Sequence, residues 1–343
     1  MARDLRLALV GFGNVGRRFA ERLRGPYARA LRQAGVRARV TGIATARHGI
    51  AVAAAGLPLG RALRLVAGGG SLARLHRGGP VPDVRAFIRR VPADVLLELT
   101  PLDPHRGRPA IGHVRQALAR GLHVVTANKG TVAFAFVPLR RLAARHGVLF
   151  LHEGAVMDGT PVFNLKERCL RGARVLSFRG TLNSTTNLVL SRMEQGESLS
   201  AAVAEAQRLG IAEADPAHDL DGWDAAVKGC ALANALMGGS VRPAQVRRRG
   251  INGLSGAEAR RALQRGTRLR LVVRGERRDR RVRVRVAPER IPLGDPLSSS
   301  GADAALLLET DLMGEVGVFE GGGTVDQTAY AVLSDLLEIA GRG

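Results

Sequence analysis

The chain has 343 residues, which is enough for two domains of ordinary size. Its net charge of +22 comes from 49 arginines and three lysines that are spread along the sequence, and with only 3% aromatic residues this composition does not favour a nucleic-acid-binding protein. No apolar run reaches the roughly 18 residues of a membrane span, and two cysteines are too few for a disulfide scaffold, so we expect a cytoplasmic protein with no nucleic-acid or membrane partner.

A glycine-rich turn between a predicted strand and a predicted helix lies near the start of the chain. Apolar side chains alternate over residues 5–9, as in a strand, and recur every four residues over 15–23, as on one helix face. Between them runs a G-x-G-x-x-G pattern, which allows a tight turn, close approach of a pyrophosphate and packing of helix on strand. A glycine-rich turn in an unrelated α/β protein would give the same pattern. If the pattern is a dinucleotide site, its residues are Gly11, Gly13, Asn14, Val15 and Gly16.

A second strand is predicted at residues 38–45. In dinucleotide folds an Asp or Glu at the end of this strand holds the ribose 2′-hydroxyl of NAD. Residues 44–48 contain no acid, and Arg47 is suited to pair with a 2′-phosphate. The sequence therefore favours NADP over NAD, unless Arg47 is one of many surface arginines.

Two more strands are predicted, at residues 94–101 and 123–130, with a helix at 107–121 between them. In open α/β sheets the ligand crevice lies at the carboxyl ends of the strands. This rule places Thr100 and Lys129 at the cofactor crevice of a Rossmann-type, doubly wound parallel sheet.

Glu153 follows the next predicted strand, in the sequence EGAVMDGTP. Together with nearby backbone carbonyl groups its carboxylate is suited to a hard cation, because such ions prefer oxygen ligands. A capped turn explains the same residues equally well.

Five polar residues, 183–187, come directly before the next predicted helix. Side chains of these types cap helix N-termini, but five exceed the needs of one cap. We expect the surplus hydroxyl, amide and N–H groups to form a polar wall that binds a substrate carboxylate.

The stretch at residues 209–230 contains five acidic residues and then a lysine, Lys228. Pro216 and Gly222 predict a loop over 211–222, and a helix follows it. On this helix Asp224 and Lys228 are four residues apart and share a face. Arginine keeps its proton whereas lysine can release it, so a lysine in an arginine-rich chain indicates a general acid or base. Chance survival of three lysines is the alternative.

The other acids of the stretch divide into two groups. Glu213 and Asp219 are the candidates for binding a substrate ammonium group. Asp215 and Asp221 are expected to cap the loop and the following helix.

Four motifs occur in an order and spacing that together resemble the homoserine dehydrogenase family: GFGNVG, VVTANKG, GTLNSTTN and GIAEADPAHDLDGWDAAVK. The resemblance covers nearly the whole chain, including the closing segment. It implies reversible hydride transfer between L-aspartate 4-semialdehyde with NAD(P)H and L-homoserine with NAD(P)+, in threonine and methionine biosynthesis. Longer members add a regulatory ACT domain, for which this sequence leaves no room.

The same resemblance implies roles for the polar residues of the second half. Lys228 would be the acid/base with Asp224 beside it, and Lys129 is the other candidate, which would also bind substrate. The substrate-binding residues would be Glu213, Asp219, Thr185 and Asn183.

Two further sites follow from the resemblance alone. A glycine loop near the nicotinamide would contain Gly322 and Gly323. The family's sodium site would be formed by Glu153 with the carbonyl groups of Val156, Asp158 and Thr160.

We therefore expect residues 1–135 and about 318–343 to form the NAD(P)-binding Rossmann domain. Residues 136–317 would form an α+β domain that binds substrate and a second copy of the chain, since the family is typically homodimeric. Another NADP-dependent amino-acid or semialdehyde dehydrogenase and a non-catalytic nucleotide-binding homologue are the alternatives. An acylating dehydrogenase would need a cysteine nucleophile, and the apolar settings of Cys169 and Cys230 do not favour one.

Overall fold

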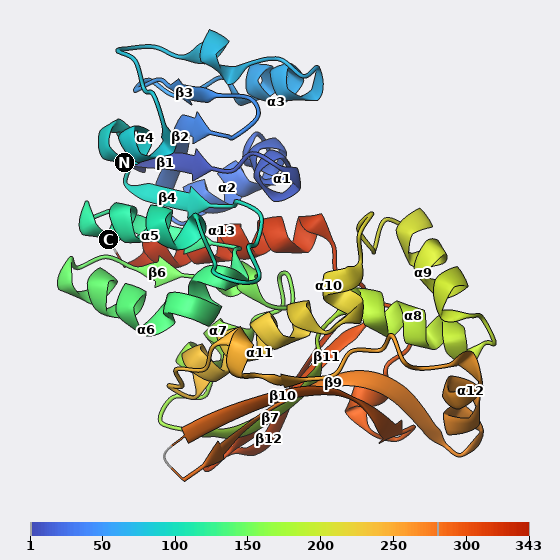
Figure 1. The fold of residues 1–343 in the computed structure, drawn as a ribbon. Coiled ribbons are helices and arrows are strands. Elements are labelled where there is room, and N and C mark those ends of the chain that lie inside the picture. Colours follow the sequence, from blue (N-terminus) through green and yellow to red (C-terminus); the bar gives the residue numbers. More distant parts are fainter. Residues whose placement is uncertain (1, 280, 343) are drawn as a thin grey trace. The chain divides into compact units, whose positions relative to one another are not determined.

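The computed structural model describes residues 2–279 and 281–342 and divides into two compact units (Figure 1). The first unit comprises residues 1–159 and 324–343, and the second comprises 160–323. From the sequence, these boundaries are expected at 135 and 318. The observed boundaries lie later in the chain, after residues 159 and 323. The reason is that residues 129–151 pack on the first sheet, whereas residues 314–320 form a strand of the second sheet.

The first unit is built on a six-stranded sheet with the order β3-β2-β1-β4-β5-β6. All neighbours are parallel except β3, which runs antiparallel to β2. Its strands are β1 (Arg3–Val10), β2 (Val36–Ala44), β3 (Ile50–Val52), β4 (Val95–Glu98), β5 (His123–Thr126) and β6 (Phe150–Leu151). Its helices are α1 (Asn14–Leu23), α2 (Pro26–Gln33), α3 (Leu59–Ala67), α4 (Val84–Arg90), α5 (Ala110–Ala119), α6 (Lys129–Arg145) and α13 (Val325–Gly341).

Helices cover both faces of this sheet, as a doubly wound fold requires. Helices α1, α2, α3 and α13 contact one another on one side, and α4, α5 and α6 form the group on the other (Figure 1). The central strands are apolar along their length because both of their faces are buried. Leu7, Leu9 and Leu97 from the strands join Phe19 of α1 and Leu336 of α13 in one core. The predicted Rossmann-type sheet is confirmed.

The second unit contains a six-stranded mixed sheet with the order β12-β11-β7-β9-β10-β8. Only β8 and β10 pair in parallel among the described strands of this sheet. Its strands are β7 (Val175–Thr181), β8 (Arg247–Arg248), β9 (Thr267–Arg278), β10 (Arg281–Pro292), β11 (Ala304–Thr310) and β12 (Gly314–Glu320). Its helices are α7 (Val162–Asn164), α8 (Ser184–Glu194), α9 (Leu199–Arg208), α10 (Ala217–Leu220), α11 (Trp223–Leu236) and α12 (Gly256–Gln264).

Helix α11 lies directly on β9 and β10 of this sheet. Its Gly229 makes the close approach possible, because a Cβ atom there would lie 2.6 Å from Val273 Cγ1 and 2.8 Å from Val284 Cγ1. Helices α8 and α12 contact each other and β9. The layered arrangement matches the predicted α+β domain. It also fixes the position of Lys228 relative to the sheet, because Lys228 is next to Gly229 on α11.

Four predictions of local secondary structure were wrong. The segments 94–101 and 123–130 are not all strand, because β4 ends at Glu98, β5 ends at Thr126 and α6 begins at Lys129. The polar run 183–187 does not precede a helix but forms its cap and first turn. The segment 211–222 is not all loop, because Pro216 caps the short helix α10, and proline is tolerated at helix starts.

Among the described residues, no helix combines the length and the apolar character needed to span a membrane.

Candidate functional site

The glycine turn of the first unit has the geometry that a phosphate-binding loop needs. Gly11 has φ +99°, and a Cβ atom on it would lie 2.5 Å from the Leu99 carbonyl oxygen. A Cβ on Gly16 would lie 2.7 Å from the Gly11 carbonyl oxygen, so helix and turn are in close contact there. Gly13 is different, because a Cβ atom added to it would have no neighbour within 4 Å. The space over Gly13 is therefore open to a ligand, at the N-terminus of α1.

Arg47 is exposed in the turn between β2 and β3. The turn is fixed by the Thr45 N–H, which donates to the Gly49 carbonyl at 3.0 Å, and by the His48 N–H, which donates to Thr45 Oγ1 at 2.7 Å. No acidic side chain occurs between residues 44 and 50. The turn after β2 thus carries an exposed arginine and no acid, whereas NAD-selective folds carry an Asp or Glu at the end of this strand.

The ends of β4 and β5 are joined by a polar network around Glu98, which is fully buried. Its carboxylate accepts hydrogen bonds from the hydroxyl groups of Thr100 and Thr126, and His113 Nδ1 lies 3.4 Å from Oε1. Asn128 caps α6 and donates from Nδ2 to the Thr100 carbonyl at 2.9 Å. Thr100 and Asn128, the N-cap of α6, are therefore tied together at this edge.

Sequence reasoning missed the contact between Glu98 and His113. Glu98 is the last residue of a buried apolar strand, and an acid at such a place is a detectable signal. His113 is brought to it by α5, from 15 residues further along the chain. Lys129, which sequence reasoning did identify, is the first residue of α6.

The second unit gathers the predicted polar residues around the N-terminus of α8. Asn183 Nδ2 donates to Asp219 Oδ1 at 2.8 Å and to Asp224 Oδ2 at 2.9 Å. Its Oδ1 accepts from the Thr186 N–H at 2.8 Å and so caps α8. One amide thus holds two carboxylates, from α10 and α11, beside a helix N-terminus. We call Asn183, Asp219, Asp224 and Lys228 the carboxylate cluster.

Lys228 completes the carboxylate cluster. Its Nζ lies 3.3 Å from Asp224 Oδ2 and donates to the Leu182 carbonyl at 2.6 Å. The side chains of Lys228 and Asp224 are only 15% and 12% exposed. This is not a solvated surface pair, and its low exposure strengthens the interaction between the charges.

The remaining acids of this segment differ from one another. Asp215 Oδ1 accepts from the Ala217 N–H at 3.1 Å and so bonds to the first residue of α10, whose N-cap is Pro216. Asp221 does not cap α11, because Gly222 occupies the N-cap and Asp221 Oδ1 instead accepts from Asn252 Nδ2. Glu213 is exposed on the preceding loop. Thr185 is buried, and its hydroxyl donates to the Ile211 carbonyl at 3.3 Å.

The predicted glycine loop at Gly322 and Gly323 lies at the end of the second unit, directly after β12. Gly322 has φ +54°, and its N–H donates to Asp303 Oδ1 at 3.1 Å. Sequence reasoning did not connect Asp303 with this loop.

The predicted cation ligands lie in a loop with unusual backbone geometry. Met157 and Asp158 both have positive φ values, 55° and 43°, which non-glycine residues seldom adopt. Glu153 is 3% exposed, and Asp158 Oδ1 accepts from the Thr328 hydroxyl at 3.0 Å. No group of three or more His, Cys, Asp or Glu side chains suited to a metal occurs in the described part of the chain. A cation here would depend on one carboxylate and on carbonyl oxygens.

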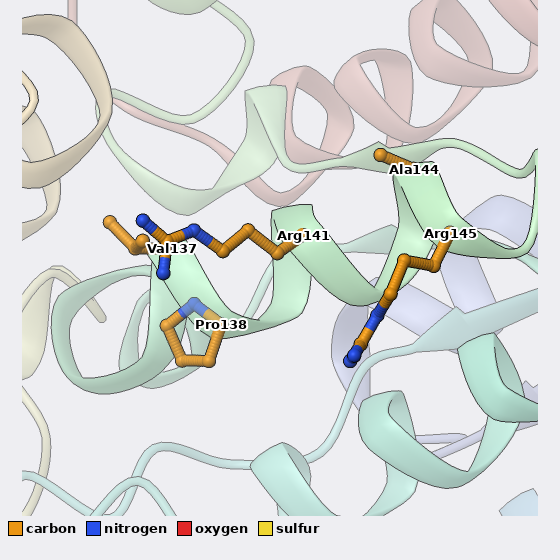
Figure 2. A pocket seen from close by; sticks show the side chains of 5 residues that line it. All are labelled: Val137, Pro138, Arg141, Ala144 and Arg145. Carbon is orange, nitrogen blue, oxygen red and sulfur yellow. The ribbon is translucent and has the colours of Figure 1, made fainter.

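Neither Cys230 nor a large surface hollow adds to these sites. The apolar setting expected of Cys169 was wrong, because this residue is exposed. Burial raises the pKa of the Cys230 thiol to about 12, which argues against a thiolate nucleophile at that position. A hollow of about 500 Å³ lies along the outer face of α6, lined by Val137, Pro138, Arg141, Ala144 and Arg145. Figure 2 shows Arg141 extending toward Val137 and Pro138, whereas Arg145 points another way. None of the predicted site residues lines this hollow.

Comparisons with known proteins agree with these observations. The model for the homoserine dehydrogenase NAD-binding domain matches residues 11–153, and the homoserine dehydrogenase model matches 161–337. An NAD(+)-dependent homoserine dehydrogenase of Pseudomonas canavaninivorans is 36% identical and covers 98% of this chain and 96% of its own. A homoserine dehydrogenase of Methanocaldococcus jannaschii is 35% identical, with 97% and 98% covered. A hyperthermophilic archaeal homoserine dehydrogenase in complex with NADPH superposes with a TM-score of 0.82 at 26% identity, over 98% of this chain and 97% of that one. The chain belongs to the homoserine dehydrogenases, which are NAD(P)-dependent oxidoreductases that act on a CH–OH group.

Proposed function

We propose that this chain interconverts L-homoserine and L-aspartate 4-semialdehyde with Lys228 as the acid/base. The observation that carries the proposal is the carboxylate cluster. In it a partly buried lysine, two carboxylates and a helix N-terminus meet within hydrogen-bonding distance.

The nicotinamide cofactor delivers or accepts the hydride. Negative charge develops on the substrate oxygen during reduction, and the Lys228 ammonium group stabilises it and donates the proton. In the oxidative direction the neutral amine takes up the hydroxyl proton. Asp224 and the Leu182 carbonyl hold Nζ in place at 3.3 and 2.6 Å. Lys129, in the first unit, is the other candidate for the proton and for binding substrate.

The amino-acid part of the substrate has complementary partners in the second unit. Its ammonium group needs carboxylates, which Asp219 and Glu213 supply. Its carboxylate is suited to the N-terminal turn of α8, where Thr185 lies. Both amide hydrogens of Asn183 are directed at Asp219 and Asp224. We therefore propose that Asn183 serves substrate binding by orienting these two carboxylates.

The nucleotide is assigned to the first unit, at the residues of the glycine turn and at Thr100 and Lys129. The open space over Gly13 supports close approach of a pyrophosphate. The exposed Arg47 and the lack of an acid after β2 support a preference for NADP. Relatives have been described with either cofactor: one is an NAD(+)-dependent enzyme and another is a complex with NADPH. The preference for NADP proposed for this chain therefore rests on Arg47. Gly322 and Gly323 are proposed to contact the nicotinamide side.

A monovalent cation such as sodium is proposed at Glu153 and the carbonyl groups of Val156, Asp158 and Thr160. The buried Glu153 carboxylate and the strained backbone at Met157 and Asp158 support a specialised role for this loop. Activity measured in sodium, potassium and a bulky organic cation at constant ionic strength tests this proposal. Equal rates in all three would argue against it.

We propose that the protein works as a cytoplasmic homodimer formed through the second unit. Its edge strand β12 pairs only with β11 among the described strands. Phe319 on β12 is 60% exposed, and Leu312 and Met313 on the adjoining turn are 74% and 61% exposed. Apolar groups of this size on an edge strand are suited to a second copy of the chain. Light scattering on the purified protein, with Phe319→Glu as the disrupting variant, tests the dimer.

The first experiment follows reduced nicotinamide by absorbance with L-homoserine and either NAD+ or NADP+. A homoserine-dependent rate with either cofactor supports the reaction, and the ratio of the two kcat/KM values gives the cofactor preference. A folded protein that binds nucleotide and shows no rate with either would overturn the proposed reaction.

A further inference from the structure

One face of α8 holds a segment from a distant part of the chain. Asn187, Ser191 and Glu194 are spaced i, i+4 and i+7 and therefore share a face. Asn187 and Ser191 form hydrogen bonds with residues 299–303. Glu194 binds Arg270, which in turn donates hydrogen bonds to Ser299. We call residues 299–303 the strap.

The contacts between α8 and the strap are partly buried. Asn187 Nδ2 donates to the Asp303 carbonyl at 2.7 Å, and the Gly301 N–H donates to Ser191 Oγ at 3.0 Å. Arg270 donates to the Ser299 carbonyl from Nη2 at 2.6 Å and from Nε at 2.9 Å. Asn187 is 1% exposed and Arg270 is fully buried.

A buried ion cluster braces this arrangement. The side chain of Glu194 is 3% exposed and accepts from Arg270 Nη1 at 2.8 Å and from Arg268 Nη1 at 2.6 Å. Arg270 also donates to Ser191 Oγ at 3.2 Å. Because Arg270 contacts both α8 and Ser299, the strap cannot shift along the helix without breaking the two hydrogen bonds from Arg270 to the Ser299 carbonyl.

The far end of the strap reaches the glycine loop. Asp303 bonds through its backbone to α8 and through its carboxylate to the Gly322 N–H, at 3.1 Å. Gly322 has φ +54°, a conformation that glycine adopts freely and that does not by itself fix the loop. Among the described residues, the Gly322 N–H bond is the one hydrogen bond recorded between the strap and residues 321–323.

We propose that Asp303 is a positioning residue that sets the loop 321–323 relative to α8. Its carboxylate holds Gly322 while Asn187 and Arg270 hold the strap. The N-terminal turn of the same helix carries Asn183 and Thr185, so one helix orients the substrate-binding groups and, through the strap, the nicotinamide-side loop. The inference rests on the proposed function, because it assumes that the loop contacts the cofactor.

The test compares Asp303→Ala with Asp303→Asn, whose amide oxygen can accept the same bond from Gly322. Asp311→Ala is the matched control. Asp311 also accepts a backbone N–H, that of Arg174 at 2.7 Å, but it lies at the turn between β11 and β12. Steady-state kinetics with the nucleotide and with homoserine varied separately, thermal midpoints and hydrogen exchange of residues 318–324 are measured for all three variants.

We expect Asp303→Ala to raise KM for the nucleotide about fivefold, with KM for homoserine and the thermal midpoint close to wild type. Hydrogen exchange of the peptide containing Gly322 should become faster in Asp303→Ala. Asp303→Asn should return the nucleotide KM and this exchange rate most of the way to wild type. Asp311→Ala should leave the nucleotide KM unchanged.

Two results would overturn the inference. One is an unchanged nucleotide KM in Asp303→Ala in an otherwise active enzyme. The other is an equal fall of every parameter together with the thermal midpoint, which would make Asp303 purely structural. A wild-type protein without homoserine-dependent activity would instead contradict the proposed function, and hydrogen exchange would still report on the bond between Asp303 and Gly322.

Discussion

Replacing the three glycines of the first turn by alanine, one at a time, separates nucleotide binding from folding. Gly11 and Gly16 are in close contact with protein backbone, whereas Gly13 faces open space. The three variants add the same methyl group within six residues of chain. They should therefore differ in stability in an order that the structure sets.

The expected free energies follow from the contacts. Gly11→Ala forces alanine to φ +99° and places Cβ 2.5 Å from the Leu99 carbonyl oxygen, which together cost about 2–5 kcal/mol. Gly16→Ala meets the Gly11 carbonyl oxygen at 2.7 Å, at a cost of about 1–3 kcal/mol, offset by about 1 kcal/mol of better helix propensity. Gly13→Ala has φ −79° and no contact, so its stability should change by less than about 0.5 kcal/mol.

Thermal unfolding followed by circular dichroism measures the stability of each variant, and titration with NADPH followed by its fluorescence measures affinity. One kcal/mol shifts the midpoint of a unit of this size by about 2–4 °C. Gly11→Ala should lower the midpoint by about 10 °C, while Gly13→Ala should keep it. Gly13→Ala should nevertheless weaken NADPH binding more than about tenfold, because its methyl group occupies the space that the pyrophosphate needs.

Wild-type affinity in Gly13→Ala would refute this reasoning, since it would mean that no phosphate approaches that backbone. A large fall in the thermal midpoint of the Gly13→Ala variant would instead refute the statement that the space over Gly13 is open.

Three further predictions concern single side chains. The Lys228→Arg variant keeps a positive charge beside Asp224, but arginine cannot release its proton. In steady-state assays this variant should keep most substrate binding and lose most turnover. A near-normal kcat would instead point to Lys129 as the acid/base. Arg47→Ser should raise KM for NADP+ about tenfold and leave KM for NAD+ nearly unchanged, and equal effects on both would contradict the 2′-phosphate contact. His152 lies between Phe136 and Phe150 with a buried Nδ1, and burial lowers its pKa from 6.5 to about 4. Between pH 4 and pH 6.5 the unfolded chain binds more protons at His152 than the folded chain does. The free energy of unfolding should therefore fall by up to about 3 kcal/mol as the pH drops from 6.5 to 4. Above pH 6.5 this group should not affect it. Urea titrations of wild type and His152→Gln should differ in this slope, and identical slopes would contradict the assignment.

The first sheet could be predicted from sequence because its signals are local. Alternating apolar residues, the G-x-G-x-x-G turn and the helix spacing of residues 15–23 all lie within 20 residues of one another. The pairing of Asp224 with Lys228 was predictable for the same reason, since both lie on one helix. The family motifs then identified which of the many polar residues belong together.

Features that depend on distant contacts were not predictable. Asn187 and Asp303 are separated by 116 residues, and Glu98 and His113 meet only because α5 packs beside β4. Pro216 indicated a loop because proline breaks helix interiors, but at the start of α10 its missing N–H costs nothing. The first unit continues to residue 159, beyond the predicted boundary at 135, because α6 and β6 still pack on the first sheet.

The second unit interrupts the first, because α13 returns to the first sheet after residues 160–323 have passed through another fold. Ala329, Val332, Leu336 and Ile339 of α13 are part of the same core as Leu7 and Leu9 of β1. During synthesis on the ribosome, the 164 residues of the second unit, 160–323, therefore separate the first part of the nucleotide-binding unit from the helix that closes its core. The second unit has all of its own strands as soon as β12 has been made. We expect the inserted unit to fold first, and the unit that begins the chain to reach its final stability only when the last helix has left the ribosome.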